Sequence, residues 1–302
     1  MKLYKTTITP TSDFATTLRG DTLFGQMCWA IFYKFGKEKL ESLLRPYREG
    51  EKPFLVVSDA FPKAYLPKPK MPSRFLNEKS EDKKLNRKKL WLSLDELMSG
   101  EYAKAKQDKE LKSTDKSSVN IHNALNYKTF HTGGDGFDPY GLTVTHLGNK
   151  DIYFLVDEEQ LSFVEFKEAF KLISEMGYGK KTTIGKGRFE YEEKEIEEIE
   201  LNNSSKTFMT LSAFSPKGLN VENIYYEPFT RFGKFGATRA YKNAFKKPIL
   251  LADVASVIEF KEVQEYQYLG RAISGLSDIP EYRDTVHQGY TIVVPLKELS
   301  ND

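Results

Sequence analysis

The alternation of strand and helix patterns constrains the fold of this chain more than any other feature of its sequence. The clearest helix follows Asp21, and its apolar residues fall on one stripe: Leu23, Phe24, Met27, Cys28, Ile31, Phe32 and Phe35. We expect Gly36 to end it, and the apolar set Leu40, Leu43 and Leu44 to continue as a second, short helix to Pro46. The patterns run in the order strand, helix, strand, insertion, strand, helix, strand, over residues 3–8, 21–36, 54–57, 62–141, 152–156, 159–176 and 187–191. This is the β-α-β-β-α-β order of a ferredoxin-like unit that carries a long insertion.

Chain length favours two domains. The chain has 302 residues, and domains usually contain about 100–200. The acidic run around residues 196–200 reads as a linker or solvated edge, and a strand pattern resumes at residue 208. This later half has few helix signals, so it is either a degenerate copy of the first half or a mostly β domain.

Composition excludes several classes of protein. The 45 basic and 43 acidic residues give a net charge of +2, which rules out a histone-like polycation but not local basic patches. The lone Cys28 excludes an intrachain disulfide framework and a multi-cysteine zinc site. The first residues have no apolar signal-peptide core, and no run of 18 apolar residues exists. We therefore expect a cytoplasmic protein that contacts no membrane and carries no metal or cofactor.

The sharpest local signal is the segment GYGKKTTIGKGR, residues 177–188, which we call the glycine loop. Its four glycines permit positive φ angles and close approach of a ligand, and its cations suit a phosphate backbone. A nucleotide-binding P-loop is excluded, because Lys181 stands where Ser or Thr is needed and because the loop follows a helix instead of a strand. The alternative is a basic turn that only faces solvent.

A second basic segment covers residues 227–248 and interleaves six cations with five aromatic residues. Cations that hold phosphates beside rings that stack on bases are typical of a surface for single-stranded nucleic acid. The competing interpretation is a loop whose rings pack into the core while its charges stay solvated.

Only one histidine has neighbours that suggest catalysis. His122 lies in a glycine-rich middle segment together with Lys128 and His131, and a His–Lys pair can serve as acid and base in RNA cleavage. No metal-binding histidine spacing and no hydrolase or dinucleotide-binding motif accompanies it. A polar contact to a ligand or to the backbone is the simpler role for His122.

These motifs together resemble a known family. The glycine loop, placed between a helix and a strand, is similar to the G-rich loop of the RAMP superfamily of CRISPR proteins. The segments LRGDTLFGQ (18–26), SDAFP (58–62), YLPKP (65–69), FKKP (245–248), GRA (270–272) and HQGY (287–290) resemble one branch. That branch is the fourth, crRNA 5′-tag-binding subunit of the type III-A Csm interference complex, and the resemblance extends almost from end to end.

The resemblance implies an α+β fold with two ferredoxin-like (RRM-like) domains, a glycine-rich loop and an inserted thumb or hairpin. The N-terminal domain would cover residues 1–203 with the insertion at about 62–141, and the C-terminal domain would cover 204–302. It implies no catalysis. The expected RNA-binding residues are Arg19, His122, Asn123, Asn126, Gly177, Gly179, Lys180, Lys181, Thr182, Thr183, Gly185, Lys186, Gly187, Arg188, Arg231, Lys234, Arg239 and Arg271.

The implied partners are the 5′ tag of the crRNA, the large polymerase-domain signature subunit, the backbone RAMP subunit of the filament and, indirectly, the target RNA. Two other functions stay open. One is a metal-independent endoribonuclease that processes CRISPR repeats with His122 as its acid–base group. The other is an adaptor that touches only protein, for which charge reversal at Lys180 and Lys181 would leave RNA binding unchanged.

Overall fold

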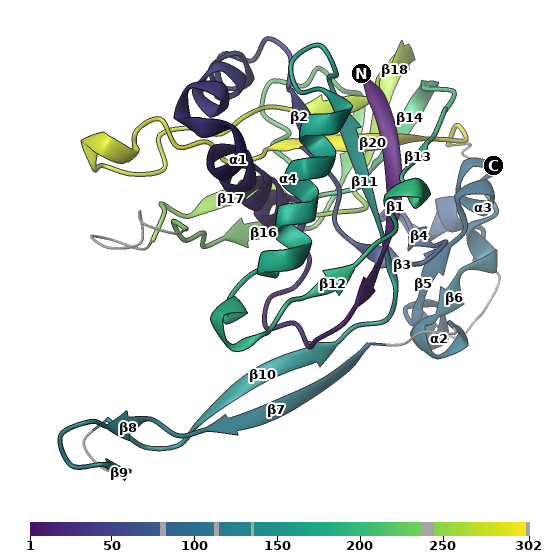
Figure 1. Cartoon of the computed structure of the whole chain (residues 1–302). Helices are drawn as coiled ribbons and strands as arrows, with labels where there is room; N and C mark the ends of the chain where they lie inside the picture. The colour runs from purple at the N-terminus through teal and green to yellow at the C-terminus, as the bar shows by residue number, and fades with distance from the viewer. Residues whose placement is uncertain (79–82, 112–114, 134–135, 237–244, 300–302) are drawn as a thin grey trace.

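The computed structural model describes residues 1–78, 83–111, 115–133, 136–236 and 245–299 (Figure 1). The fold is α+β, with several antiparallel sheets and few helices. Arg239, one of the predicted RNA-binding residues, lies outside the described residues. Within the described ranges, no helix is both long enough and apolar enough to cross a bilayer.

The first half is built around one antiparallel sheet with strand order β12-β1-β11-β2. In chain order its main elements are β1 (Lys2–Pro10), α1 (Gly20–Glu49), β2 (Leu55–Val57), β11 (Lys150–Val156), α4 (Phe163–Met176) and β12 (Phe189–Glu190). Two short strands extend it, β3 (Phe61–Pro62) beside β11 and β13 (Glu197–Glu198) beside β1. The central pair β1–β11 is held in one register, in which Tyr4 lies opposite Phe154 and Leu3 opposite Leu155.

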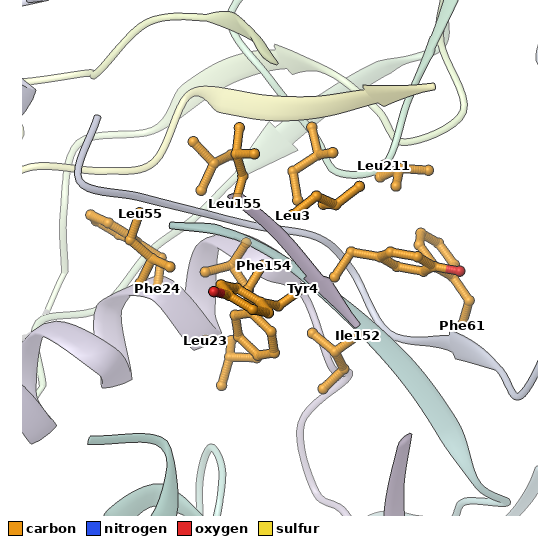
Figure 2. Close-up of a cluster of buried hydrophobic side chains, with 14 of the residues drawn as sticks. Leu3, Tyr4, Leu23, Phe24, Leu55, Phe61, Ile152, Phe154, Leu155 and Leu211 are labelled. Carbon is orange, nitrogen blue, oxygen red and sulfur yellow. The ribbon is translucent and has the colours of Figure 1, made fainter. Parts of the chain in front are cut away.

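This register sorts side chains onto two buried faces. Tyr4 stacks on Phe163 of α4, and Phe154 contacts Phe166 and Phe170 on the same helix. Leu155 points away from the helices, toward the sheet of the second half (Figure 2). Because both faces of β11 are covered, all of its residues are buried.

Helix α1 differs from the expectation at its two ends. It begins at Gly20, before Asp21, and it continues to Glu49 through a bend at Gly36, where φ is 86° and ψ is 174°. This backbone conformation is not helical and is almost restricted to glycine, so Gly36 ends the first helical segment as predicted. The second segment runs to Glu49, past Pro46, where it was expected to end. Helix α4 does end at Gly177, as predicted, and a capping box between Ser162 and Glu165 begins it.

The second half is a five-stranded antiparallel sheet with strand order β15-β18-β14-β20-β19. Its strands are β14 (Ser204–Thr210), β15 (Asn223–Tyr225), β18 (Val257–Glu265), β19 (Tyr268–Gly270) and β20 (Tyr290–Leu296). A separate ribbon pairs β16 (Pro228–Arg231) with β17 (Ile249–Ala252). The described residues from 204 onward contain no α-helix, so the two helices of a second complete ferredoxin-like unit are not confirmed.

One hydrophobic core joins the two halves. Met209 of β14 and Ile292 of β20 belong to the same buried cluster as Leu3 and Leu155 of the first sheet. Phe208, the neighbour of Met209, belongs to a smaller cluster in the second half. The alternation of side chains along β14 thus connects the second sheet to both clusters.

The predicted insertion has two parts. A small compact part contains β4 (Leu66–Pro67), α2 (Lys83–Asn86), β5 (Lys89–Leu92), α3 (Leu94–Met98) and β6 (Lys106–Gln107), and Leu66, Leu92 and Leu97 join the main core. The other part is a long hairpin of β7 (Lys116–His122) and β10 (Tyr140–His146), with β8 (Leu125–Asn126) and β9 (His131–Thr132) near its tip. The hairpin projects away from the body of the molecule (Figure 1).

Candidate RNA-binding surface

The glycine loop is closed at its neck by Tyr178. The backbone N–H of this buried tyrosine donates to the Gly187 carbonyl at 2.8 Å. Its hydroxyl donates to the Thr17 carbonyl at 2.7 Å and accepts from the Arg19 backbone N–H at 3.0 Å. Burial raises the pKa of the hydroxyl well above its ordinary value, so it stays a neutral donor. Through its backbone Tyr178 joins the two ends of the loop, and through its side chain it fastens them to the segment of residues 11–19, which we call the support segment.

The four glycines of the loop have different surroundings, although all have positive φ angles. A Cβ on Gly187 would lie 2.1 Å from the Tyr178 carbonyl oxygen, and one on Gly179 would lie 2.5 Å from Cβ of Thr16. A Cβ on Gly177 would lie 2.9 Å from the Lys186 carbonyl oxygen, whereas one on Gly185 would meet nothing within 4 Å. Three glycines are therefore needed for packing within the protein, and Gly185 has open space beside it.

The loop presents three exposed cations. Lys180, Lys181 and Arg188 are exposed, and no carboxylate of the described residues forms an ion pair with them. Lys186 differs, because its ammonium binds Asp13 of the support segment at 2.9 Å. The hydrogen bond from Lys186 helps to lower the pKa of the Asp13 carboxyl. The loop therefore offers about three charges to a polyanion.

The two threonines of the loop lie in a single short turn, Thr182–Ile184, with Thr182 half-buried and Thr183 exposed. Lys181 precedes this turn with a φ of 68°, which is unusual for a residue other than glycine. The backbone N–H of Lys180 donates to the Thr16 hydroxyl at 3.0 Å. The support segment thus holds the loop by side chains as well as by backbone.

The β7–β10 hairpin lies beside the glycine loop. The Lys181 ammonium is 5.5 Å from the centroid of the Tyr140 ring, and this ring stacks on that of His122 at 5.6 Å. His146 at the base of β10 lies 3.5 Å from Asp13. The structure therefore brings His122 close to the glycine loop, although the two are more than fifty residues apart in sequence.

Arg19 is held inside the protein by two carboxylates. Its guanidinium contacts Asp59 at 3.2 Å and Asp253 at 2.7 Å, and it lies 4.7 Å from the centroid of the Phe229 ring. Burial raises the pKa of Asp59 to about 7, although Arg19 and the Gly20 N–H act in the opposite direction. Arg19 thus links the two halves, and these contacts compete with an RNA contact.

The second basic segment is also tied to the protein. Arg231 is half-buried, with Nε 2.7 Å from the buried Asp21 carboxylate and a further contact to the Thr22 hydroxyl. Lys234 is exposed, and its ammonium lies 4.7 Å from the centroid of the Phe245 ring. Phe235 is buried against Tyr282. The interpretation of this segment as a loop anchored by its rings therefore fits Phe235, while Phe245 stays exposed.

The outward face of the β16–β17 ribbon carries no charge. Thr230 lies opposite Leu250 in the ribbon, and Phe232 continues the same face. Leu250 is 69% exposed and Phe232 is 68% exposed. Exposed apolar surface of this kind is typical of an interaction site.

The other predicted contacts lie apart from the loop. Asn123 is exposed beyond the end of β7, and the Asn126 side chain accepts from the Lys128 backbone N–H in the turn near the hairpin tip. Arg271 is exposed after β19. Sequence reasoning missed Tyr140, Asp13 and Thr16, whose roles depend on contacts distant in sequence; the polar run Thr11-Ser12-Asp13 before the first helix was the available signal.

No protein-family model and no curated protein matches the sequence. Solved structures do match the fold. A chain in the "Crystal structure of Csm1-Csm4 cassette in complex with cA4" is 16% identical with a TM-score of 0.62, and the match covers 98% of this chain and 99% of that one. A chain in the "Crystal structure of Csm3-Csm4 subcomplex in the type III-A CRISPR-Cas interference complex" is 17% identical with a TM-score of 0.61, over 99% and 100% of the two chains.

This chain has a Csm4-like fold. Csm4 is the component that the two solved structures have in common. The match extends over nearly the whole chain. The resemblance inferred from the glycine loop and its accompanying motifs is therefore confirmed at the level of the fold.

Proposed function

We propose that this chain is a non-catalytic, cytoplasmic subunit of a type III-A CRISPR effector complex that grips the 5′ tag of the crRNA. The observation that carries the proposal is the set of exposed cations on the glycine loop, Lys180, Lys181 and Arg188, within a Csm4-like fold. Backbone phosphates of RNA are bound by such cations. The stacked rings of His122 and Tyr140 beside them offer aromatic surface to a splayed base.

The test is RNA binding by the charge-reversed loop. We expect Lys180→Glu combined with Lys181→Glu to weaken binding of a tag oligonucleotide at least tenfold at physiological salt without lowering the melting temperature. Three phosphate contacts at about −0.7 each predict a log–log salt slope of about −2 for the unaltered chain. Lys34→Glu combined with Lys37→Glu is the matched control, since both lysines are exposed on α1. Equal binding by the loop variant and the wild type would contradict the proposal.

We further infer that the chain bridges the large signature subunit and the backbone RAMP subunit. Chains with this fold occur in solved structures of a Csm1–Csm4 cassette and of a Csm3–Csm4 subcomplex. The uncharged outward face of the β16–β17 ribbon is a suitable surface for one of these proteins. Co-purification tests this: Leu250→Asp should reduce recovery of one protein partner, and Val263→Asp on β18, which is similarly exposed, should not.

The absence of catalysis is part of the proposal. His122 is stacked on Tyr140, and its Nε2 has no hydrogen-bond partner within the described residues. Incubation of the purified chain with repeat RNA in the absence of metal should leave the RNA intact. Cleavage that His122→Ala abolishes would instead support the endoribonuclease alternative.

The fold of the first half supports a single ferredoxin-like unit. Its strand order β12-β1-β11-β2 places the fourth strand beside the first and the third beside the second. Along the chain, α1 lies between β1 and β2, and α4 lies between β11 and β12, which gives the β-α-β-β-α-β order. Such a sheet with a glycine loop after its second helix is the scaffold that the proposed tag-binding site requires.

Contact of this chain with the target RNA would be indirect under this proposal, because the target pairs with the guide part of the crRNA.

A further inference from the structure

Lys181 has a left-handed backbone conformation, which is unusual for a residue other than glycine. Its φ of 68° and ψ of 24° lie in the left-handed region, where side chains other than glycine are strained. Its carbonyl accepts from the N–H groups of Ile184 and Lys186, both at 3.2 Å, which hold it there. Strain of this kind persists at functional sites when the surroundings enforce it.

The side chain of Lys181 reaches from the glycine loop to the hairpin, at the end of the β7–β10 ladder that is nearer the tip. Its ammonium lies 5.5 Å from the centroid of the Tyr140 ring. Tyr140 lies directly opposite His122 in the β7–β10 ladder, and the two rings are stacked with an interplanar angle of 21°. Tyr140 is 44% exposed, so the cation–ring contact lies at the protein surface and within reach of a ligand.

We propose that Tyr140, backed by His122, is a positioning residue that holds the Lys181 ammonium for a backbone phosphate of single-stranded RNA. The proposal rests on the proposed function and extends it to a residue outside the glycine loop. A lysine side chain in solvent samples many rotamers, and a ring that restricts them reduces the entropy lost when a phosphate binds. A cation–ring contact also fixes the position of the ammonium but leaves its charge intact, whereas a carboxylate would neutralise that charge.

Lys186 provides the contrast within the same loop. Its ammonium is held by Asp13, which supplies the opposite charge. Lys181 is held by an uncharged ring, so its full charge remains for the phosphate. The loop thereby contains one cation that fastens it to the support segment and one that is positioned for RNA.

A double-mutant cycle on the full chain, with a tag RNA oligonucleotide as the probe, tests this. Tyr140→Leu should weaken binding about two- to fivefold, the range for an exposed cation–ring contact. Lys181→Gln should weaken it further and make the salt slope shallower by about 0.7, whereas Tyr140→Leu should leave the slope unchanged. The double variant should bind no more weakly than Lys181→Gln alone. Tyr140→Phe, which keeps the ring, should bind like the wild type.

Tyr127→Leu is the matched control, because Tyr127 is an exposed ring nearer the tip of the same hairpin. The effect of Tyr127→Leu on the free energy of RNA binding, large or small, should add fully to the effect of Lys181→Gln. Additive effects of Tyr140→Leu and Lys181→Gln, or a Tyr140→Phe variant as weak as Tyr140→Leu, would overturn the positioning role while leaving the proposed function intact. Wild-type affinity in Lys181→Gln and in the charge-reversed loop would overturn both.

Discussion

At the residue scale, the glycine loop depends on close packing at one glycine and on open space at another. At Gly187 a methyl group would collide with the Tyr178 carbonyl oxygen, which is backbone and cannot move aside. We expect Gly187→Ala to break the closed neck, to lower the free energy of unfolding by more than about 2 kcal/mol, and to abolish tag binding. Chemical denaturation and RNA titration measure the two effects.

Gly185→Ala is the control for that change. Gly185 has nearly the same φ, 80°, but a Cβ there meets no atom within 4 Å. Its cost should be the backbone strain alone, about 1 kcal/mol. If both alanine variants lost the same stability, the collision at Gly187 would not be the reason for its glycine.

The buried carboxyl of Asp59 gives stability a defined pH dependence. Burial raises its pKa to about 7 in the folded chain, while an unfolded Asp titrates near about 3.9. Between these values the folded state binds more protons, so the contribution of Asp59 to the free energy of unfolding falls as pH rises from about 4 to about 7. Urea unfolding of the wild type and of Asp59→Asn at several pH values measures this contribution, as the difference between their free energies of unfolding.

The difference is required because His287 acts in the opposite direction. Burial lowers the pKa of His287 to about 4, so its contribution rises with pH between about 4 and 6.5. His287 is present in both the wild type and Asp59→Asn, so its contribution cancels when their free energies of unfolding are subtracted. A stability difference between wild type and Asp59→Asn that stayed constant from pH 4 to 7 would contradict the raised pKa.

At the element scale, the sequence predicted what local patterns determine. Strand β1, strand β11 and the end of α4 at Gly177 follow from alternation, apolar runs and a glycine stop. The break of α1 at Gly36 and the helical segment after it were also predicted, from the glycine and from the apolar set Leu40, Leu43 and Leu44. The extension of that segment past Pro46 to Glu49 was not, because Tyr47, which packs into the same core, lies beyond the proline. The pairing of Tyr140 with His122 depends on the register of two strands separated by a long hairpin tip, which no local pattern encodes.

The hairpin tip carries large exposed rings that folding does not require, and the proposed function gives them a role in RNA contact. Tyr127 is 81% exposed and Phe130 is 75% exposed, so neither contributes to a core. We expect replacement of residues 123–139 by an Asn-Gly turn to leave the melting temperature nearly unchanged, because Leu142 and Val144 at the hairpin base remain packed. Nuclease protection of a bound crRNA should be kept over the tag and lost over the first guide nucleotides.

The outcomes of that experiment separate two roles of the hairpin. Loss of protection over the tag itself would mean that the tip, and not the glycine loop, holds the tag. Unchanged protection over the whole RNA would remove the hairpin tip from the proposed interface. A large fall in melting temperature would show that the tip stabilises the body of the protein.

At the scale of the whole molecule, the predicted RNA-binding cations divide by what lies near them in space. Lys180, Lys181 and Arg188 keep exposed charges, whereas Arg19 and Arg231 are engaged by carboxylates that the chain brings from other elements. Asp253 lies 234 residues from Arg19, so composition alone could not distinguish a free cation from a paired one. Sequence therefore located the glycine loop but overestimated the exposed charge of the second basic segment.

The shared core makes a prediction about the boundary expected at residues 203 and 204. Met209 and Ile292 pack into the same cluster as Leu3 and Leu155, and Arg19 binds Asp253 across the two halves. Separation would expose this apolar surface and leave Asp253 without Arg19, so fragments 1–203 and 204–302 should not unfold cooperatively when expressed alone.

The full chain should instead unfold in one transition. Trp29 and Trp91 both lie in the first half, so their fluorescence reports that half, while far-ultraviolet circular dichroism reports the strands of both. Because the core is continuous, the two signals should give the same midpoint in urea. A fragment 1–203 that unfolds cooperatively at the midpoint of the full chain would mean that the interface between the sheets contributes little. The glycine loop could then be studied, with its tag RNA, on the first half alone.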